Sequence, residues 1–252
     1  MRLPWLFPDQ VRMFPPSASA LKQPNGLLAA GGDLSPARLL HAYRKGIFPW
    51  FNPGEPILWW TPDPRLVLFP EELVLTPRDA RWLRNCSWTL RADTSFAQVL
   101  AGCAQPRAAQ DGTWLGHAMQ HAYQQLHELG YAHSVEVYEG KELIAGIYGL
   151  AIGRVFFGES MFGRRSNASK VALFALATGL RELGFALLDC QVRSEHLVSR
   201  GAREISRADF ELLLMQNVAA TPLASATKTK LEQPGLWNQA WPLGLVCDLQ
   251  SF

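Results

Sequence analysis

The sequence changes in character near residue 64, and this change constrains the fold more than any other feature. The stretch from Ile47 to Trp60 mixes prolines with aromatic residues. Proline lacks the backbone N–H that a helix interior or a central strand uses, so we expect irregular chain that packs its aromatic rings on a neighbouring surface. Pro62-Asp63-Pro64 then predicts a boundary between a small N-terminal domain, residues 1–64, and a larger domain, residues 65–252.

The N-terminal domain contains one clear helix signal. Ser35 offers the side-chain oxygen of an N-cap, and Pro36 suits the first helical position. We expect this helix to run to about Lys45 and to stop at Gly46.

The larger domain shows regular periodicities. Apolar residues at helical spacing predict an amphipathic helix that ends at Gly130. These residues are Leu115, Met119, Ala122, Leu126 and Leu129. Residues 132–161 are typical of strands, and Glu139-Gly140 suits a hairpin turn, so an antiparallel meander is expected there.

The remainder adds a helix, a strand and a further helix. Ser166-Asn167 can cap a helix, Phe185 to Leu188 indicates a buried strand, and a last helix begins near Ser206. From about residue 219 the chain is expected to form a loose tail. This order predicts an α+β fold with a mixed, mostly antiparallel sheet, compatible with an acetyltransferase-like arrangement and with other α+β folds.

The strongest candidate for chemistry is Asp189-Cys190-Gln191, at the end of the predicted buried strand. In an extended chain Asp189 and Gln191 point to one side and Cys190 to the other. A carboxylate beside an amide could orient an amine nucleophile and accept its proton. The carboxylate could equally satisfy N–H groups of the following loop, and spacing does not decide between the two interpretations.

A second candidate is the run from Phe156 to Phe162. Glu159 and Met161 share a face if the strand continues, which would place an acidic group beside a flexible apolar wall. Gly158 permits close approach of another backbone there. From the residues alone, such a run is more often part of a core strand than of a pocket.

A third candidate is a set of arginines. Arg78, Arg81 and Arg84 lie three residues apart and fall on one side of a short helix. A one-sided cationic helix suits contacts with the phosphates of a nucleic acid. A solvated face is the commoner explanation of such a pattern by itself.

Metal and cofactor signals are missing. The cysteines form no C-x-x-C pair, so free thiols are expected rather than a zinc site or disulfides. His117 and His121 have the spacing of a metal pair but lie on the polar face of their helix, so we expect no metal. The sequence has no ATP loop, dinucleotide fingerprint or acyl-CoA pyrophosphate loop, so we expect no cofactor and an already activated substrate.

Composition excludes a membrane protein but says little about partners. No apolar run reaches the ~18 residues that a membrane span needs. The N-terminus lacks the apolar core of a signal peptide, so a cytoplasmic location is expected. The net charge of +2 is shared by many proteins that never contact nucleic acid, and it decides nothing.

Several short motifs, taken together, resemble one family, the leucyl/phenylalanyl-tRNA–protein transferases. They are Pro24 to Leu28, Gly31 to Pro36, Gly46 to Trp50, Trp59 to Arg65, Leu126 to Gly130, Gly158 to Phe162, Asn167 to Lys170, Asp189 to Gln191 and Gly201-Ala202. Each motif is weak alone, but they occur in the order of the family. Thr61 departs from the serine that is usual there, and Ile147 replaces a methionine, which could alter the preference for methionine.

The resemblance implies a small N-terminal domain packed on a larger domain with an acetyltransferase-like (GNAT-like) core. It implies transfer of leucine or phenylalanine, and less readily methionine, from aminoacyl-tRNA to proteins that begin with Lys or Arg, which marks them for degradation. The expected protein needs no cofactor and is a monomer.

The resemblance also implies roles for individual residues. Asp189 and Gln191 correspond to the catalytic pair. The implied amino-acid pocket consists of Ile147, Phe156, Met161 and Leu188. Glu159 is able to hold the donor's ammonium group, and Trp50 and Trp114 are implied to contact the pocket and the 3′-terminal adenosine. The positions of Arg78, Arg81 and Arg84 match a basic region for the acceptor stem.

Two other functions remain as alternatives. An acyl-CoA N-acetyltransferase is opposed by the missing pyrophosphate loop, and a non-catalytic RNA-binding module leaves Asp189 and Gln191 without a purpose. For aminoacyl transfer, a protein α-amino group has an unperturbed pKa of ~7.7–8.0, so part of it is already neutral near pH 7. We therefore expect positioning of amine and ester to contribute more than strong base catalysis.

Overall fold

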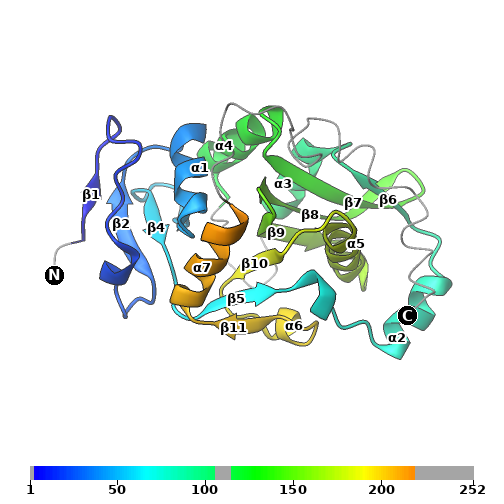
Figure 1. Cartoon of the computed structure of the whole chain (residues 1–252). Helices are drawn as coiled ribbons and strands as arrows, with labels where there is room; N and C mark the ends of the chain where they lie inside the picture. Colours follow the sequence, from blue (N-terminus) through cyan, green and yellow to red (C-terminus); the bar gives the residue numbers. More distant parts are fainter. Residues whose placement is uncertain (1–2, 106–114, 219–252) are drawn as a thin grey trace, which may run out of the picture.

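The computed structural model describes residues 3–105 and 115–218, and the described chain builds two β-sheets (Figure 1). The smaller sheet has the strand order β1-β2-β4-β3. Its strands are β1 (Trp5–Leu6), β2 (Leu27–Gly31), β3 (Phe48–Pro49) and β4 (Leu58–Trp60). β1 is parallel to β2, and the other pairs are antiparallel.

The aromatic segment that begins at Ile47 is more regular than its prolines suggest. Leu58–Trp60 forms a central strand between β2 and β3, so the expectation of irregular chain throughout this segment was wrong. Pro49 lies in the edge strand β3, where a missing N–H does least harm. Pro53 and Pro56 fall in the loop before β4.

Helix α1 (Pro36–Arg44) confirms the helix predicted in this region. The Ser35 hydroxyl accepts a hydrogen bond from the backbone N–H of Arg38, and Pro36 occupies the first helical position. Gly46 follows with φ +72°, a left-handed conformation that ends the helix.

The larger sheet has the strand order β11-β5-β10-β9-β8-β7-β6. Its strands are β5 (Arg65–Leu68), β6 (Thr89–Ala92), β7 (Ala132–Glu139), β8 (Glu142–Ile152), β9 (Val155–Gly163), β10 (Leu187–Gln191) and β11 (Arg203–Ile205). Only β9 and β10 are parallel within this sheet. The predicted meander is therefore β7-β8-β9, and the mixed, mostly antiparallel sheet is confirmed.

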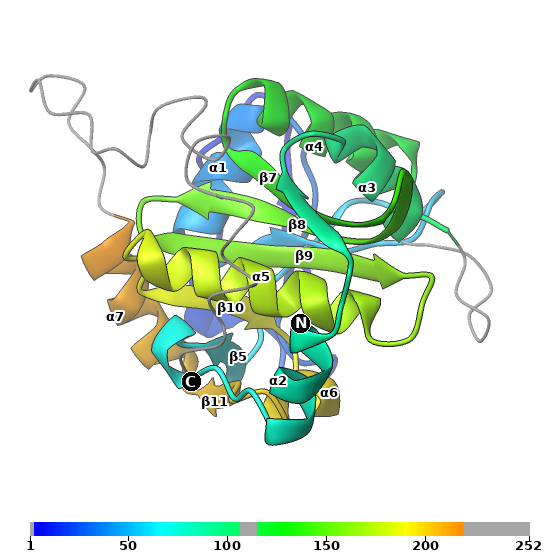
Figure 2. The same cartoon turned by 90° about the vertical axis from the view of Figure 1, so that its right-hand side faces the viewer.

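Helices cover both faces of the larger sheet (Figure 2). α3 (Phe96–Cys103) and α4 (His117–Glu128) pack on one face, which we call the α4 face, and α5 (Ala168–Glu182) packs on the other, the α5 face. Alternation along the strands divides the core accordingly. Tyr148 and Phe157 belong to the α4 face, whereas their neighbours Ile147 and Phe156 belong to the α5 face.

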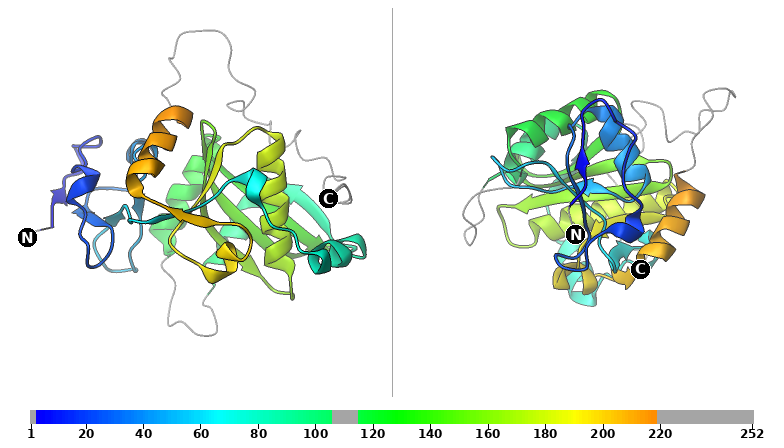
Figure 3. Two further views of the ribbon diagram at one scale, coloured as in Figure 1. Left: turned by 60° about the horizontal axis from the view of Figure 1, so that its bottom comes forward. Right: turned by 90° about the vertical axis from the view of Figure 1, so that its left-hand side faces the viewer.

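The remaining helices are α2 (Pro77–Arg84), α6 (Glu195–Val198), α7 (Arg207–Asn217) and the 3₁₀ turns η1 (Ser17–Ser19) and η2 (Pro70–Glu72). α7 lies between the two sheets (Figure 3). Its Phe210 and Leu214 share one hydrophobic core with Tyr43 and Phe48 of the N-terminal part. The two sheets are therefore joined by a continuous apolar interior.

Most helix ends agree with the sequence, with two exceptions. α7 begins directly after Ser206, close to its predicted start, and the Ser206 hydroxyl caps it by accepting from the backbone N–H of Asp209. Asn167 precedes α5, but its side chain makes no capping bond because its φ of +68° is left-handed. Leu129, assigned to the apolar stripe of α4, is exposed. The predicted tail from residue 219 lies outside the described residues.

In the ranges 3–105 and 115–218, none of the helices combines the length and the apolar composition needed to cross a membrane.

Candidate active site

A cavity opens where the two parallel strands of the larger sheet separate. β9 and β10 are paired as far as Phe157 and Asp189 and not beyond. A cavity of about 360 Å³ lies at this point and is lined by the following residues of both strands. Its apolar lining includes Ile147, Met161, Leu173 and Leu188, and its polar lining includes Glu159, Ser160 and Gln191. The cavity therefore has an apolar side and a polar side.

A β-bulge in β9 creates this division. The register between β8 and β9 shifts by one residue between Tyr148 and Gly149, which leaves Glu159 as an extra residue. Met161, opposite Ile147, packs with the α5-face cluster. Glu159 instead reaches hydroxyls on the α4 face. The expectation that Glu159 and Met161 share a face was therefore wrong, because it assumed a regular strand.

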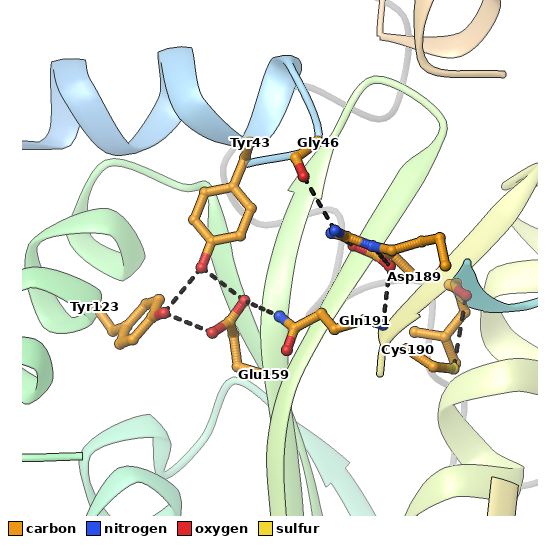
Figure 4. A network of polar contacts seen from close by, with 9 residues as sticks. Tyr43, Gly46, Tyr123, Glu159, Asp189, Cys190 and Gln191 are labelled. Carbon is orange, nitrogen blue, oxygen red and sulfur yellow. Dashed lines mark hydrogen bonds and ion pairs between the residues drawn. The ribbon is translucent and has the colours of Figure 1, made fainter. Parts of the chain in front are cut away.

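Glu159 is the centre of a hydrogen-bond network (Figure 4). Tyr43 from α1 donates to Oε1 at 2.7 Å, and Tyr123 from α4 donates to Oε2 at 2.5 Å. The two hydroxyl oxygens are 2.9 Å apart. The Gln191 side-chain amide donates to Oε1 at 3.1 Å. In the described chain, the partners of this carboxyl group are thus two phenols and an amide.

The surroundings of Glu159 make it a weaker acid than usual. Burial of the carboxyl group raises its pKa, and the charge of Asp189 acts in the same direction. Hydrogen bonds from Tyr123 and Tyr43 and the charge of Arg65 offset part of this effect, which leaves the pKa at about 7. Glu159 can therefore exist in either protonation state near neutrality.

Asp189, the second carboxylate at the site, is fully buried and already engaged. Arg65 donates from Nε to Oδ1 at 2.8 Å and from Nη2 to Oδ2 at 2.7 Å. The backbone N–H of Gln191 donates to Oδ1 at 2.9 Å. Both oxygens are therefore occupied by strong donors, one of them a charged, two-pronged guanidinium.

Arg65 links this carboxylate to the rest of the molecule. Its guanidinium is fully buried and also donates to the carbonyl oxygen of Gly46, at 3.0 Å. It lies 4.8 Å from the ring centroid of Phe48 and 4.6 Å from that of Phe210. One side chain thus joins the end of α1, strand β3 and helix α7 to the end of β10.

The end of β10 is irregular rather than extended. Its register against β5 shifts between Asp189 and Gln191, and Gln191 has a φ of +64°. Cys190 packs with the α5-face cluster, and burial raises the pKa of its thiol. The left-handed turn directs the Gln191 amide to Glu159, so the predicted polar pair forms part of a larger cluster.

The family model described as leucyl/phenylalanyl-tRNA protein transferase matches residues 67–215, and the model of that family's N-terminal domain matches residues 32–63. The chain belongs to this family. The resemblance drawn from the short motifs is thereby confirmed.

Individual members of the family are similar over most of their length. A protein named leucyl/phenylalanyl-tRNA–protein transferase from Saccharophagus degradans is 51% identical over 239 residues, which is 95% of each chain. One of the same name from Ectopseudomonas mendocina is 56% identical over 216 residues, 86% of this chain and 95% of that protein. A solved structure of L-PGS from Bacillus licheniformis is similar with a TM-score of 0.39 and 10% identity, over 71% of this chain and 51% of that protein.

Most residues that the family resemblance implies lie at the cavity. Those in its lining are Trp50, Ile147, Glu159, Met161, Leu188, Asp189 and Gln191. Phe156 does not line the cavity; its ring is buried in the α5-face core. Trp114 lies outside the described residues.

The three arginines lie apart from the cavity, on α2. Arg78, Arg81 and Arg84 are exposed, and Arg78 and Arg81 border a shallow depression with Trp82 and Trp88. The two indole rings pack edge to face at 5.0 Å. The helix is fixed by a capping box in which Thr76 and Asp79 bond to each other's backbone.

Within the described residues, no group of three or more His, Cys, Asp or Glu side chains could hold a metal ion. His117 and His121 are exposed on α4, as expected.

Three site residues escaped the sequence analysis: Arg65, Tyr43 and Tyr123. Arg65 begins an apolar run, Leu66 to Leu68, and a charge at the start of a buried strand requires a partner. Tyr123 falls on the apolar side of α4, where its hydroxyl also requires a partner. The sequence therefore indicates that Arg65 and Tyr123 need polar partners, but it does not identify those partners.

Proposed function

We propose that this protein transfers leucine or phenylalanine, and methionine less well, from aminoacyl-tRNA to the α-amino group of proteins with N-terminal Lys or Arg, which marks them for degradation. The observation that carries the proposal is the two-sided cavity at the end of β9 and β10 in a chain of this family. A side chain that is not branched at Cβ, aliphatic or aromatic, suits the apolar side, and the reacting amine and ester suit the polar side.

The apolar side accounts for the choice of amino acid. Ile147, Met161 and Leu188 come from three neighbouring strands, and Leu173 of α5 closes the wall. Such a wall separates side chains that differ by one methylene by only ~1–3 kcal/mol, so methionine is expected as a slower donor. Trp50, 47% exposed at the rim, is available to stack on the terminal adenosine.

The chemistry requires no energy source beyond the substrate, because an ester attacked by an amine yields a more stable amide. In our proposal Gln191 orients the amine at the polar side of the cavity. Asp189 acts mainly by position: it holds the Gln191 backbone and the Arg65 guanidinium, and these donors occupy both of its oxygens. Glu159 faces the same space and is able to attract the donor's ammonium group.

We assign the acceptor stem of the tRNA to α2. Replacing Arg78, Arg81 and Arg84 by Ala should raise the KM for charged tRNA and flatten its dependence on salt, because fewer counterions are released on binding. Reaction with a short aminoacyl-adenosine donor should be unaffected. Arg154→Ala, an exposed arginine in the β8–β9 turn, is the control. Equal damage to both donors would contradict the assignment.

Three broader inferences accompany this function. The β7-β8-β9 meander followed by α5 and the parallel strand β10 supports an acetyltransferase-like (GNAT-like) core, with the boundary to the N-terminal domain near residue 64. A monomer is also proposed. A cytoplasmic location follows from the use of charged tRNA.

The decisive experiment incubates the purified chain with labelled leucyl-tRNA and a peptide that begins with Arg. The expected product is peptide that carries labelled leucine at its N-terminus. The same peptide with an acetylated N-terminus should remain unlabelled, and a peptide that begins with Ala should react poorly. Failure to label the Arg peptide, with the protein folded, would overturn the proposal.

A further inference from the structure

The carboxyl oxygens of Glu159 and the hydroxyl oxygens of Tyr43 and Tyr123 make more close contacts than there are hydrogens to fill them when Glu159 is ionised. Three contacts close a ring: Tyr43 to Oε1 at 2.7 Å, Tyr123 to Oε2 at 2.5 Å, and Tyr43 to Tyr123 at 2.9 Å. The two phenols supply only two hydrogens. Both are used if the phenols donate to an ionised Glu159, and the contact between the phenols then has no hydrogen.

One added proton completes the ring. With Oε1 protonated, Glu159 donates to Tyr43, Tyr43 donates to Tyr123, and Tyr123 donates to Oε2. Every contact then has one hydrogen, and Oε1 still accepts from the Gln191 amide. The geometry therefore contains a defined place for one proton, and this place is reached from the cavity because Glu159 forms part of its wall.

The other groups around Glu159 leave this proton exchangeable. Tyr43 and Tyr123 are fully buried, and burial raises the pKa of both phenols well above the usual value, so they keep their hydrogens. Tyr148 of β8 approaches from the α4 face, and burial raises its pKa well above the usual value, so it also keeps its hydrogen. Cys103 of α3 lines the cavity on this face. Asp189 and Arg65 face Glu159 from β10 and β5 with opposite charges that are paired to each other.

We propose that Glu159, held by Tyr43 and Tyr123, takes the proton that the attacking amine loses and returns it to the ribose oxygen that leaves. This inference rests on the proposed function of aminoacyl transfer. It replaces Asp189, whose oxygens are occupied by Arg65, as the proton acceptor of the reaction.

The step balances without any further reactant. The amine nitrogen forms a bond to the ester carbonyl carbon, and the bond from that carbon to the ribose oxygen breaks. The proton leaves nitrogen for Glu159 and then passes from Glu159 to the ribose oxygen, so that amine and ester become amide and alcohol. A carboxyl group with a pKa of about 7 is suited to accept and then donate a proton at neutral pH.

The first experiment measures the proton directly, without substrates. Infrared spectra of the full chain across a pH titration should contain a protonated-carboxyl band that disappears as the pH rises through about 7. The band should be missing in Glu159→Gln. Tyr148→Phe is the matched control: it removes a buried phenol that packs on Tyr123 but has no hydrogen-bond partner among the described residues. This variant should retain the band and its midpoint.

The second experiment measures single-turnover transfer at saturating leucyl-tRNA and Arg-peptide against pH. Below neutrality the wild-type rate should be inversely proportional to the square of the hydrogen-ion concentration, because both the amine and Glu159 must lose a proton. Glu159→Gln should react at least tenfold more slowly. Its rate should be inversely proportional to the first power of the hydrogen-ion concentration, because only the amine still titrates. Tyr43→Phe and Tyr123→Phe should move the Glu159 step to higher pH, since each removes a hydrogen bond that lowers its pKa. Tyr148→Phe should behave as the wild type.

The outcomes separate a proton role from a binding role and from a failed function. A Glu159→Gln variant with an unchanged saturated rate and a raised KM for the donor would show that Glu159 only holds the donor's ammonium, and would overturn the proposal. A wild-type protein without the infrared band would also overturn it, even with transfer intact. If the chain transfers nothing, the proposed function fails and the catalytic role fails with it, while the infrared titration still reports whether the proton site exists.

Discussion

Two carboxylates lie at the end of the parallel strand pair, and they are stabilised in opposite ways. Asp189 is fully buried beside a buried arginine that binds both of its oxygens. Glu159 borders the cavity, and its hydrogen-bond partners in the described chain are phenols and an amide. Asp189 thus carries a charge that is neutralised locally, whereas Glu159 can change its charge at neutral pH.

The difference shows how one site can combine a rigid part and a titrating part. A buried ion pair with complete hydrogen bonding fixes geometry, and it costs several kcal/mol to disrupt by removal of one partner. A carboxyl group bonded to neutral donors keeps a pKa set mainly by burial. The buried ion pair of Asp189 and Arg65 therefore fixes the end of β10, whereas Glu159 holds the exchangeable proton at the cavity.

The largest expected effect comes from breaking the rigid part. Arg65→Met should reduce the free energy of unfolding by about 3–5 kcal/mol, because Asp189 is left buried and unpaired. Urea denaturation measures this change. Arg203→Met, which removes an exposed arginine from its ion pair with Glu72, should cost at most about 1 kcal/mol.

The double variant Arg65→Met with Asp189→Asn separates the charge effect from packing. If the unpaired charge causes the loss, replacing it by a neutral amide should restore a substantial part of the stability. A double variant no more stable than Arg65→Met alone would show that the contacts of Arg65 with Phe48, Phe210 and Gly46 matter more than its ion pair.

The next effect concerns the titrating part and depends on pH. The pKa of Glu159 is raised from 4.5 to about 7 on folding, so its contribution to stability is fully present below pH 4.5 and is lost as the pH rises through about 7. Glu159→Gln has no such loss. The free energy of unfolding of Glu159→Gln, relative to that of the wild type, should therefore be up to about 3 kcal/mol higher at mildly alkaline pH than at acid pH. Urea denaturation at the two pH values measures this difference.

Glu139→Gln serves as the control for this comparison, because Glu139 is half exposed and bonded at the surface to Arg165. Its stability relative to the wild type should change little with pH. A Glu159→Gln variant with an equally flat difference would mean that Glu159 stays ionised throughout, and the contrast with Asp189 would disappear.

A third carboxylate, Asp79, has a lowered pKa, in contrast to the raised pKa of Glu159. Burial alone would raise its pKa, but hydrogen bonds from Thr76, Lys170 and Arg200, with the charge of Arg200, lower it to about 2. This contribution is present above pH 3.8 and is lost as the pH falls through about 2. Asp79→Asn should remove about 2 kcal/mol of acid-dependent stability, seen in urea curves at low pH.

Asp209→Asn is the matched control for Asp79, since both carboxylates bond to the hydroxyl of a helix N-cap but Asp209 is exposed. Its acid dependence should stay close to that of the wild type. If both variants behave alike, the hydrogen bond to the N-cap hydroxyl, rather than the cations, governs the response of Asp79.

Local signals predicted the elements of this fold better than the details of its site. Ser35 caps α1 as expected, and α7 begins close to its predicted start near Ser206, because a helix start depends on a few adjacent residues. The hairpin at Glu139-Gly140 was likewise predictable from its turn residues. Leu58–Trp60 was missed as a central strand because prolines nearby do not prevent a strand that begins after them.

The site depends on information that local patterns lack. An alternating pattern does not reveal one extra residue, so the bulge that separates Glu159 from Met161 was not predicted. The pair of Arg65 and Asp189 joins positions 124 apart in the sequence. Tyr43 and Tyr123 come from two different helices and meet only once both pack against the sheet.

The smallest expected effect lies on the apolar side of the cavity. Met161→Ala enlarges the space beside Ile147, so the preference for leucine over valine should fall by about tenfold, in line with ~1–3 kcal/mol for small differences in an apolar pocket. Competition between charged tRNAs measures this ratio, and Met119→Ala, a buried methionine outside the cavity lining, controls for lost stability. Because the bulge places Met161 and Glu159 on different faces, the transfer rate of Met161→Ala should depend on hydrogen-ion concentration in the same way as that of the wild type. A variant that altered this dependence but kept the donor ratio would show that Met161 contributes to the proton step, and the division of the cavity into two sides would fail.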